Sequence, residues 1–179
     1  MVYILLAPGF EEMEALVPAD LLRRAGVEVA LVSLEGDFAP GGHGITVKAD
    51  CALADVEPDR AEMIVLPGGG VGVANLGEDP RVEALVKRAA DEHKWLAVIC
   101  AAPSLLSRWG LLAGKKAVCY PTWADKIAGA AFCPGEKLAV DGKTVTGQAA
   151  GASFEFGLKL VEVLTDAATA DRVRKEIVL

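Results

Sequence analysis

The sequence has little histidine and no closely spaced cysteines, and both shortages limit the chemistry that it can support. Two histidines, His43 and His93, stand fifty positions apart in a chain of 179 residues. A zinc site of the usual Cys/His type needs closer ligands, and a Cys-His or Ser-His-Asp triad would have to use one of these two. The four cysteines contain no C-x-x-C pair. We therefore predict no metal, no cofactor and no disulfide framework.

Basic clusters and long apolar runs are missing as well. Lys and Arg total 18 against 25 Asp and Glu, a formal charge of −7, and no basic run offers a partner to a phosphate backbone. No segment reaches the roughly 18 apolar residues of a spanning helix, and the N-terminus lacks the basic start of a signal peptide. The 53% hydrophobic content excludes disorder. We expect a soluble, cytoplasmic protein without a membrane or nucleic-acid partner.

Short apolar runs alternate with amphipathic segments along the chain. Strands are expected at residues 2–7, 27–34, 61–66, 95–99 and 117–120, with an edge strand at 45–48 and a hairpin of 137–140 with 144–146. Helices are expected at 11–25, 80–92, 103–109, 153–164 and 167–176, and a loop at 35–44. Apolar strands that alternate with helices predict an α/β fold with a mostly parallel sheet covered on both faces. We expect one domain over residues 1–179.

A cysteine stands at the junction of a predicted buried strand and a predicted helix. Cys100 follows the run 95–99 and precedes Ala101 and Ala102, whose small side chains permit the tight turn of a nucleophile elbow. The N-terminus of the following helix is expected to lower the pKa of the thiol. The alternative is a buried cysteine that acts as a small hydrophobe. Spacing alone does not decide between the two.

Two other strand ends carry groups of chemical interest. Gly68, Gly69 and Gly70 lack the Lys-Ser/Thr ending of a phosphate loop, so they form either a tight turn or a source of backbone N–H groups for an oxyanion. Spacing favours the plain turn. The run 11–14 holds three glutamates at a helix start, and Glu14 lies on the apolar side of that helix. We expect Glu14 to be partly buried and protonated, and the glutamates at 11 and 12 to be solvated.

The three strand ends together resemble a known family. The motifs are GFEEMEA at 9–15, VLPGG at 65–69 and AVICAAP at 97–103, and matches at 17–26, 153–156 and 177–179 extend the likeness over essentially the whole chain. The sequence resembles the ThiJ/PfpI superfamily, in particular the branch of the human parkinsonism-associated protein deglycase and its bacterial ThiJ-like relatives. That resemblance implies a flavodoxin-like three-layer sandwich with a nucleophile-elbow cysteine, and a homodimer.

The resemblance also assigns roles to individual residues. Cys100 matches the reactive, oxidation-prone cysteine, and Glu14 matches the carboxylic acid that hydrogen-bonds it. Gly69 and Ala101 match the residues whose backbone N–H groups form the oxyanion site. Family activities include a glutathione-independent glyoxalase that turns methylglyoxal into lactate, and the disputed removal of early glycation adducts. Redox-regulated chaperone and oxidative-stress roles are assigned to the family too.

The sequence departs from the family pattern at the rim of the expected pocket. Tyr120 replaces a histidine near the cysteine, and a tyrosine hydroxyl can hydrogen-bond but is a weak base near neutral pH. The segment around Gly151 reads AAGA where the family has Gly-Pro-Gly-Thr. Tyr120, Gly151 and Gly70 are therefore expected around the pocket. Ala101 stands where the protease-like branch has histidine, which makes a peptidase improbable.

Three functions stay open at this stage. The first is an enzyme of the glyoxalase (lyase) or deglycase (hydrolase) type that acts on small carbonyl compounds or glycated adducts through Cys100 and Glu14. The second is a redox sensor or chaperone with an oxidisable Cys100 and little turnover. The third is an inherited scaffold with an inert or anion-binding site. For the homodimer, the helix at 11–25 is the expected interface, with Arg23 or Arg24 near the partner's site.

Overall fold

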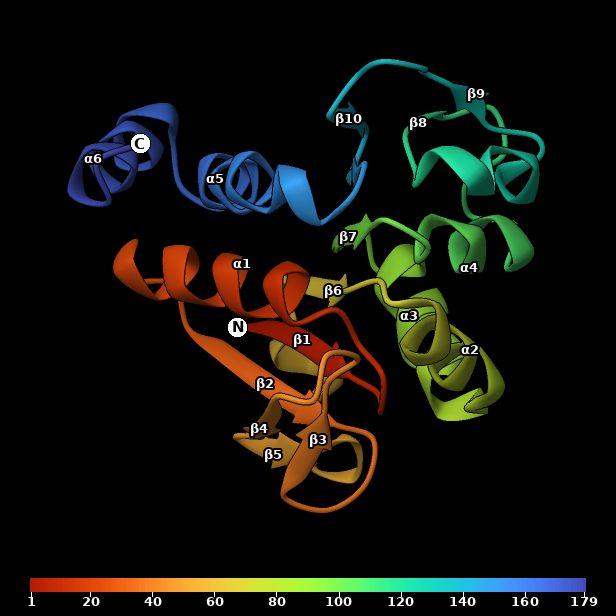
Figure 1. The fold of residues 1–179 in the computed structure, drawn as a ribbon, viewed down its shortest axis with the longest axis horizontal. Coiled ribbons are helices and arrows are strands. Elements are labelled where there is room, and N and C mark those ends of the chain that lie inside the picture. The colour runs from red at the N-terminus through yellow and green to blue at the C-terminus, as the bar shows by residue number, and fades with distance from the viewer.

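A seven-stranded sheet forms the centre of the computed structural model, which describes all residues 1–179 (Figure 1). Its strand order is β10-β11-β7-β6-β1-β2-β5. All neighbouring strands are parallel except the edge strand β10, which pairs antiparallel with β11. The sheet consists of β1 (Val2–Leu6), β2 (Val29–Ser33), β5 (Cys51–Ala52), β6 (Met63–Leu66), β7 (Trp95–Ile99), β10 (Leu138–Asp141) and β11 (Thr144–Gly147).

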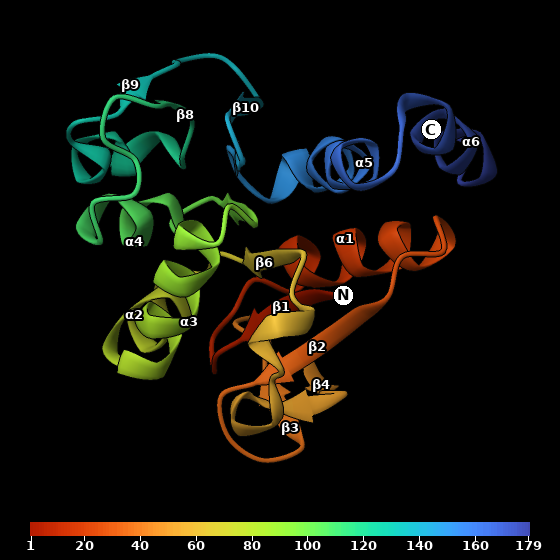
Figure 2. The same cartoon turned by 180° about the vertical axis from the view of Figure 1, so that it is seen from behind.

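Helices cover both faces of this sheet, which confirms the predicted flavodoxin-like three-layer fold. Every residue of β1 is buried, because alternate side chains enter two different core clusters. One cluster lies under α2, α3 and α4, and the other under α1, α5 and α6 (Figures 1 and 2). The helices are α1 (Glu12–Arg24), α2 (Gly70–Glu78), α3 (Pro80–Asp91), α4 (Pro103–Arg108), α5 (Ser153–Leu164) and α6 (Ala167–Glu176). The high apolar content thus fills two cores.

Helix α1 carries candidate residues of the site and is held in place by α5. The two helices run side by side in Figures 1 and 2 and contact each other extensively. A Cβ at Gly157 of α5 would lie 2.7 Å from Leu21 Cδ1 and 3.0 Å from Pro18 Cα. Glycine at 157 therefore permits the close approach of the two helices. None of the helices combines the length and the apolar character that crossing a membrane requires.

The structure corrects the sequence-based expectations at three places. The expected loop at 35–44 contains β3 (Phe38–Pro40), which forms a separate hairpin with β4 (Thr46–Lys48), so the latter is no edge strand of the main sheet. Residues 70–78 contain three glycines and carry little helix propensity, yet they form α2. The expected strand at 117–120 shortens to β8 (Lys116–Ala117), paired with β9 (Ala131–Phe132), because the N–H of Val118 donates to Thr146 Oγ1 at 2.9 Å.

Candidate active site

The candidate residues gather at the carboxyl ends of three adjacent strands. The loop after β1 leads to Glu14, the loop after β6 contains Gly68 and Gly69, and β7 ends directly before Cys100. The chain passes from β1 to β2 on one side, whereas β6 lies on the other side of β1. Such a reversal of strand order leaves a crevice beyond the strand ends, where open α/β sheets bind ligands.

Cys100 adopts a backbone conformation that L-residues rarely occupy. Its φ is +65°, in the left-handed region, where a side chain other than glycine is strained. The Cys100 N–H donates to the carbonyl of Gly147 at 3.0 Å, and the Cys100 carbonyl accepts from the N–H of Tyr120 at 2.8 Å. These two bonds fix the sharp turn between β7 and α4. The half-buried thiol therefore projects from an elbow, as the flanking alanines predict.

The Glu14 carboxyl lies completely buried beside this thiol. Its Oε2 accepts the backbone N–H of Gly68 at 2.7 Å, and the carboxyl and the Cys100 thiol hydrogen-bond each other. Its Oε1 has no hydrogen-bond partner. A Cβ at Gly68 would lie 2.5 Å from Glu14 Oε2 and 2.6 Å from Cys100 Cβ. Only glycine at this position lets the acid and the thiol meet.

Burial sets the protonation of both groups. Desolvation raises the pKa of Glu14 to about 7, although the hydrogen bonds from Gly68 and Cys100 oppose the rise. This agrees with the expectation of a protonated Glu14. Desolvation, followed by the charge and the hydrogen bond of Glu14, raises the pKa of Cys100 to about 12. The N–H of Ala101, at the turn into the following helix, lowers the pKa of the thiol, as expected, but burial and the charge of Glu14 outweigh it, so the net shift is upward.

Two backbone N–H groups point at the Cys100 sulfur. They belong to Gly69 and Ala101, and their hydrogen bonds lower the pKa of the thiol against the larger opposing effects. Gly69 has a φ of +87°, and a Cβ there would collide with the carbonyl oxygen of Gly9 and the N–H of Glu11. Glycine at 69 thus permits both the left-handed turn and the close approach of the loop after β1. An oxygen attached to a carbon on the sulfur would find these two donors nearby.

The three residues expected at the rim of the pocket come from three different segments of the chain. Tyr120 is tied to Cys100 by its backbone N–H, and its side chain is half exposed. Gly70 begins α2 directly after Gly69 and is exposed. Gly151 is exposed in the short turn Ala150–Ala152 that precedes α5. The roles of these three residues remain predictions.

The glutamates expected in solvent are mostly covered. Glu12 is only 4% exposed, and its carboxylate accepts the N–H of His43 at 2.7 Å and faces His43 Nδ1 at 2.9 Å. The Glu11 carboxylate lies 3.4 Å from the same nitrogen. Helix periodicity could not reveal this burial, because the covering loop lies some thirty residues away in the sequence. The ligand atoms of the three residues lie within 4.8 Å of one another, so this group has the spacing of a metal site.

Neither histidine is placed as a partner of the thiol. His43 Nδ1 faces the carboxylates of Glu11 and Glu12. His93 precedes β7 whereas Cys100 follows it, so the two residues lie at opposite ends of this strand. The acid-base group next to the sulfur is the carboxyl of Glu14.

Helix α1, the expected dimer interface, is largely covered within the chain. Leu21 and Leu22 are buried, whereas Met13 is 48% exposed. Arg23 pairs with Asp50 at 2.6 Å, and Arg24 pairs with Asp20 at 2.7 Å. The homodimer, with an arginine near the partner's site, stays a prediction.

Comparisons with known proteins agree with this architecture. The model of the DJ-1/PfpI family matches residues 1–163. The DJ-1 homolog B of Arabidopsis thaliana is 38% identical over 180 residues, and the match covers 99% of this chain and 41% of the plant protein. The chain therefore spans less than half the length of that relative. The crystal structure of Drosophila melanogaster DJ-1beta has a TM-score of 0.96 at 32% identity, over 99% of this chain and 97% of the fly protein.

Two further relatives have names that state an activity. A protein of Thermococcus kodakarensis named a deglycase is 33% identical, over 91% of this chain and 98% of its own length. A Caenorhabditis elegans protein named a glutathione-independent glyoxalase is 31% identical, over 90% of this chain and 87% of its own length.

Proposed function

The chain belongs to the DJ-1/PfpI family, and from this premise we propose that residues 1–179 form one catalytic domain of the glyoxalase and deglycase type, acting on reactive carbonyl compounds such as methylglyoxal. One observation carries the proposal. The buried Glu14 carboxyl hydrogen-bonds the Cys100 thiol and holds its second oxygen, Oε1, free of any partner. A carboxyl in that position can exchange protons with both the sulfur and a bound substrate.

The first step is attack of the sulfur on the aldehyde carbon of methylglyoxal. The thiol proton passes to the Glu14 carboxylate as the carbon–sulfur bond forms, so no free thiolate has to persist in the buried site. The aldehyde oxygen becomes the oxyanion of a hemithioacetal. The N–H groups of Gly69 and Ala101, which already face the sulfur, stabilise that oxygen.

The second step moves a proton between the two substrate carbons. Glu14, now a carboxyl, gives its proton to the oxyanion; the resulting carboxylate removes the proton from the former aldehyde carbon and delivers it to the neighbouring carbon through an enediol. The former aldehyde carbon is thereby oxidised to a thioester and the ketone carbon is reduced to an alcohol, without an external oxidant. Water then cleaves the thioester, which releases lactate and restores the thiol. Carbinolamine adducts of methylglyoxal are substrates of the same type, because the amine leaves as the sulfur adds.

Lactate formation by the purified protein tests the proposal. Wild type should convert methylglyoxal into lactate without glutathione, and Cys100→Ser should lose this activity. Cys133→Ser is the matched control, because Cys133 is another free cysteine and lies in the loop after β9. Equal lactate formation by wild type and Cys100→Ser would exclude a cysteine-dependent glyoxalase.

A second candidate function rests on the same unpartnered oxygen. A protonated Glu14 could donate from its carboxyl to an oxidised sulfur, which would favour a sulfinate at Cys100 and a role in redox sensing. Mild peroxide should then add two oxygens to Cys100 before any other cysteine, measured by mass spectrometry of the intact protein and its peptides. Equal oxidation of all four cysteines would remove this candidate.

A further inference from the structure

A cavity of about 600 Å³ lies beyond the carboxyl ends of β1 and β2. Leu6, the last residue of β1, and Ser33 and Leu34 at the end of β2 line it. The opposite wall comes from the end of α2 and the start of α3. Neither Cys100 nor Glu14 is among its lining residues. Its volume is in the range of small-molecule sites, which are roughly 300 to 1,000 Å³.

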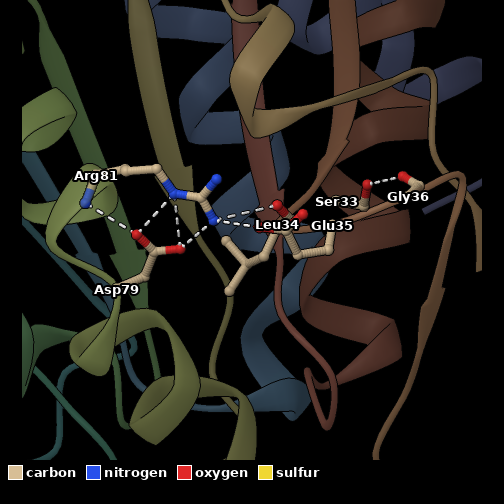
Figure 3. A network of polar contacts seen from close by, with 6 residues as sticks. All are labelled: Ser33, Leu34, Glu35, Gly36, Asp79 and Arg81. Atoms are coloured by element: carbon tan, nitrogen blue, oxygen red, sulfur yellow. Dashed lines mark hydrogen bonds and ion pairs between the residues drawn. The ribbon is translucent and has the colours of Figure 1, made fainter.

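Ion pairs and hydrogen bonds hold the walls of this cavity together. Arg81 of α3 donates to both carboxylate oxygens of Asp79 and, at 2.7 Å, to Glu35 in the turn after β2 (Figure 3). Ser33 Oγ donates to the carbonyl of Gly36 in the same turn. Asn75 Nδ2 of α2 donates to the carbonyl of Pro8 at 2.8 Å. The turn after β2, the start of α3 and the loop after β1 are therefore fixed relative to one another.

The charges at the rim are unbalanced. Three carboxylates line the cavity, those of Glu35, Glu78 and Asp79, against the single guanidinium of Arg81. Arg81 is already neutralised, since Asp79 and Glu35 both accept from it. Glu78 is exposed at the end of α2 and forms no ion pair or side-chain hydrogen bond. A cation that enters the cavity thus meets a free carboxylate, and an anion meets no free positive charge.

Apolar side chains also line the cavity. Pro8 and Pro80 are exposed and Leu34 is 9% exposed, so these residues supply accessible apolar surface, whereas Leu6 and Ala39 are almost completely covered. Phe38 stands at the rim with 59% of its surface exposed, although a large aromatic side chain is usually covered. An aromatic ring attracts organic cations, because the ring face carries partial negative charge, and a carboxylate on the same cavity adds to that attraction. A bare metal ion would instead need several converging oxygens, and the carboxylates that line this cavity do not form a group with metal-ligand spacing.

We propose that this cavity binds an organic ammonium ion with an aryl or alkyl body. The apolar body contacts Leu34, Pro8 and Pro80, and the ammonium group is held by the Phe38 ring and the Glu78 carboxylate, which line the same cavity. The Asn75 side-chain oxygen, whose amide nitrogen is held by Pro8, is a further acceptor on the wall. The side chains of Ser33, Asn75 and Arg81 already donate within the chain, so the site favours a ligand that donates hydrogen bonds. This site does not depend on the proposed function, because neither Cys100 nor Glu14 lines the cavity.

Three probes of one shape and different charge test the proposal on the unmodified protein. Benzylammonium, benzyl alcohol and benzoate are titrated into the 15N-labelled protein while the amide signals are followed by NMR. Benzylammonium should shift the signals of residues 33–39 and 75–81 and saturate at millimolar concentration. We expect it to bind about threefold to thirtyfold more tightly than benzyl alcohol, and more weakly at high salt, as ion–aromatic and ion–ion contacts imply.

Two variants and one control locate the charge. Glu78→Gln and Phe38→Ala should each weaken benzylammonium binding about threefold or more while binding of benzyl alcohol to Glu78→Gln stays unchanged. Glu136→Gln, which removes another exposed and unpaired carboxylate far along the chain, should have no effect. Equal affinity for the three probes, tighter binding of benzoate, or shifts confined to other residues would each overturn the proposal. Lactate formation is not measured, so failure here leaves the proposed function intact.

Discussion

Two carboxyl groups two residues apart on α1 are both buried, but their surroundings treat them in opposite ways. Glu12 is 4% exposed and Glu14 is fully buried. Glu12 accepts from the N–H groups of His43 and Ile45 and from the His43 ring. Glu14 accepts from the N–H of Gly68 and hydrogen-bonds a thiol, and its second oxygen has no partner.

The supply of donors decides the charge of each group. Burial alone would raise the pKa of Glu12, but the hydrogen bonds from the His43 ring and from backbone N–H groups outweigh it and lower the pKa. At Glu14 the donors are too few, and burial raises the pKa to about 7. Burial therefore does not make a carboxyl reactive. A buried carboxyl whose hydrogen bonds are incomplete keeps a proton that can be transferred near neutral pH.

The largest difference between substitutions at Glu14 and at Glu12 is expected in turnover. Glu14→Gln keeps the size of the side chain but removes the group that exchanges protons, so we expect kcat for methylglyoxal to fall about 10²- to 10⁴-fold. Glu12→Gln changes a carboxylate that binds the loop at His43 and Ile45 and exchanges no proton with the substrate. The kcat of this variant should therefore stay close to that of wild type. Lactate formation by both variants, with folding checked by circular dichroism, measures the contrast. An equal loss in the two variants would show that Glu14 has no special role.

A second contrast follows from the pH dependence of stability. Because the pKa of Glu14 is raised on folding, from 4.5 to about 7, the native state binds more protons than the unfolded chain in this window. The stability that protonated Glu14 supplies is therefore present below pH 4.5 and lost as the pH rises through 7. The difference in unfolding free energy between wild type and Glu14→Gln should fall by up to roughly 3 kcal/mol over that range.

Urea unfolding at several pH values measures this difference. The same ionisation should appear in the activity of wild type, because only the carboxylate can take the thiol proton. kcat/KM should therefore rise with pH through about 7. A flat difference in stability, together with a flat activity profile, would place the pKa of Glu14 at its ordinary value and remove the comparison with Glu12.

The sequence was sufficient for Glu14 and insufficient for Glu12. Helical spacing from Phe10 to Leu21 places Glu14 on the apolar side, and the structure buries it there. The same spacing leaves Glu12 in solvent, and its burial depends on a hairpin loop that folds over the helix from residues 41–45. Local periodicity predicts which side of a helix meets its sheet. It contains no information on a covering loop from elsewhere in the chain.

The same limit applies to the fold. The runs of β1 and β7 are wholly apolar, so their strands and the layered architecture could be predicted. Helix α2 could not, because its glycines disfavour a helix, and tertiary contacts stabilise it. A Cβ at Gly72 would lie 2.7 Å from the backbone of Phe10, so glycine there serves the packing of α2 on the loop after β1. The net rise of the thiol pKa could not be predicted, because the burial that causes it is a property of the whole fold.

Substitutions of the glycines next to the two carboxyls should differ in their effects on stability and activity, and this third difference is smaller. A Cβ at Gly68 would strike both Glu14 Oε2 and Cys100 Cβ, and the latter cannot move because the elbow is fixed. We expect Gly68→Ala to cost about 2 to 3 kcal/mol of unfolding free energy and most of the activity. The three atoms nearest to a Cβ at Gly41 all belong to the side chain of Glu12. Gly41→Ala should cost about 1 kcal/mol and keep its activity, measured by urea unfolding and lactate formation.

The smallest effect should be seen at His43, the partner that keeps Glu12 ionised. The hydrogen bond to Glu12, with the charges of Glu11 and Glu12, raises the pKa of His43 above 6.5. Its contribution to stability is therefore complete below pH 6.5 and is lost as the pH rises through the higher, folded-state pKa. An NMR titration of the imidazole signals, assigned with His93→Gln, should find the His43 pKa raised in wild type and closer to 6.5 in Glu12→Gln. If the His43 imidazole has the same pKa in both proteins, its charge does not stabilise the Glu12 carboxylate. The backbone N–H groups alone must then account for the lowered pKa of Glu12.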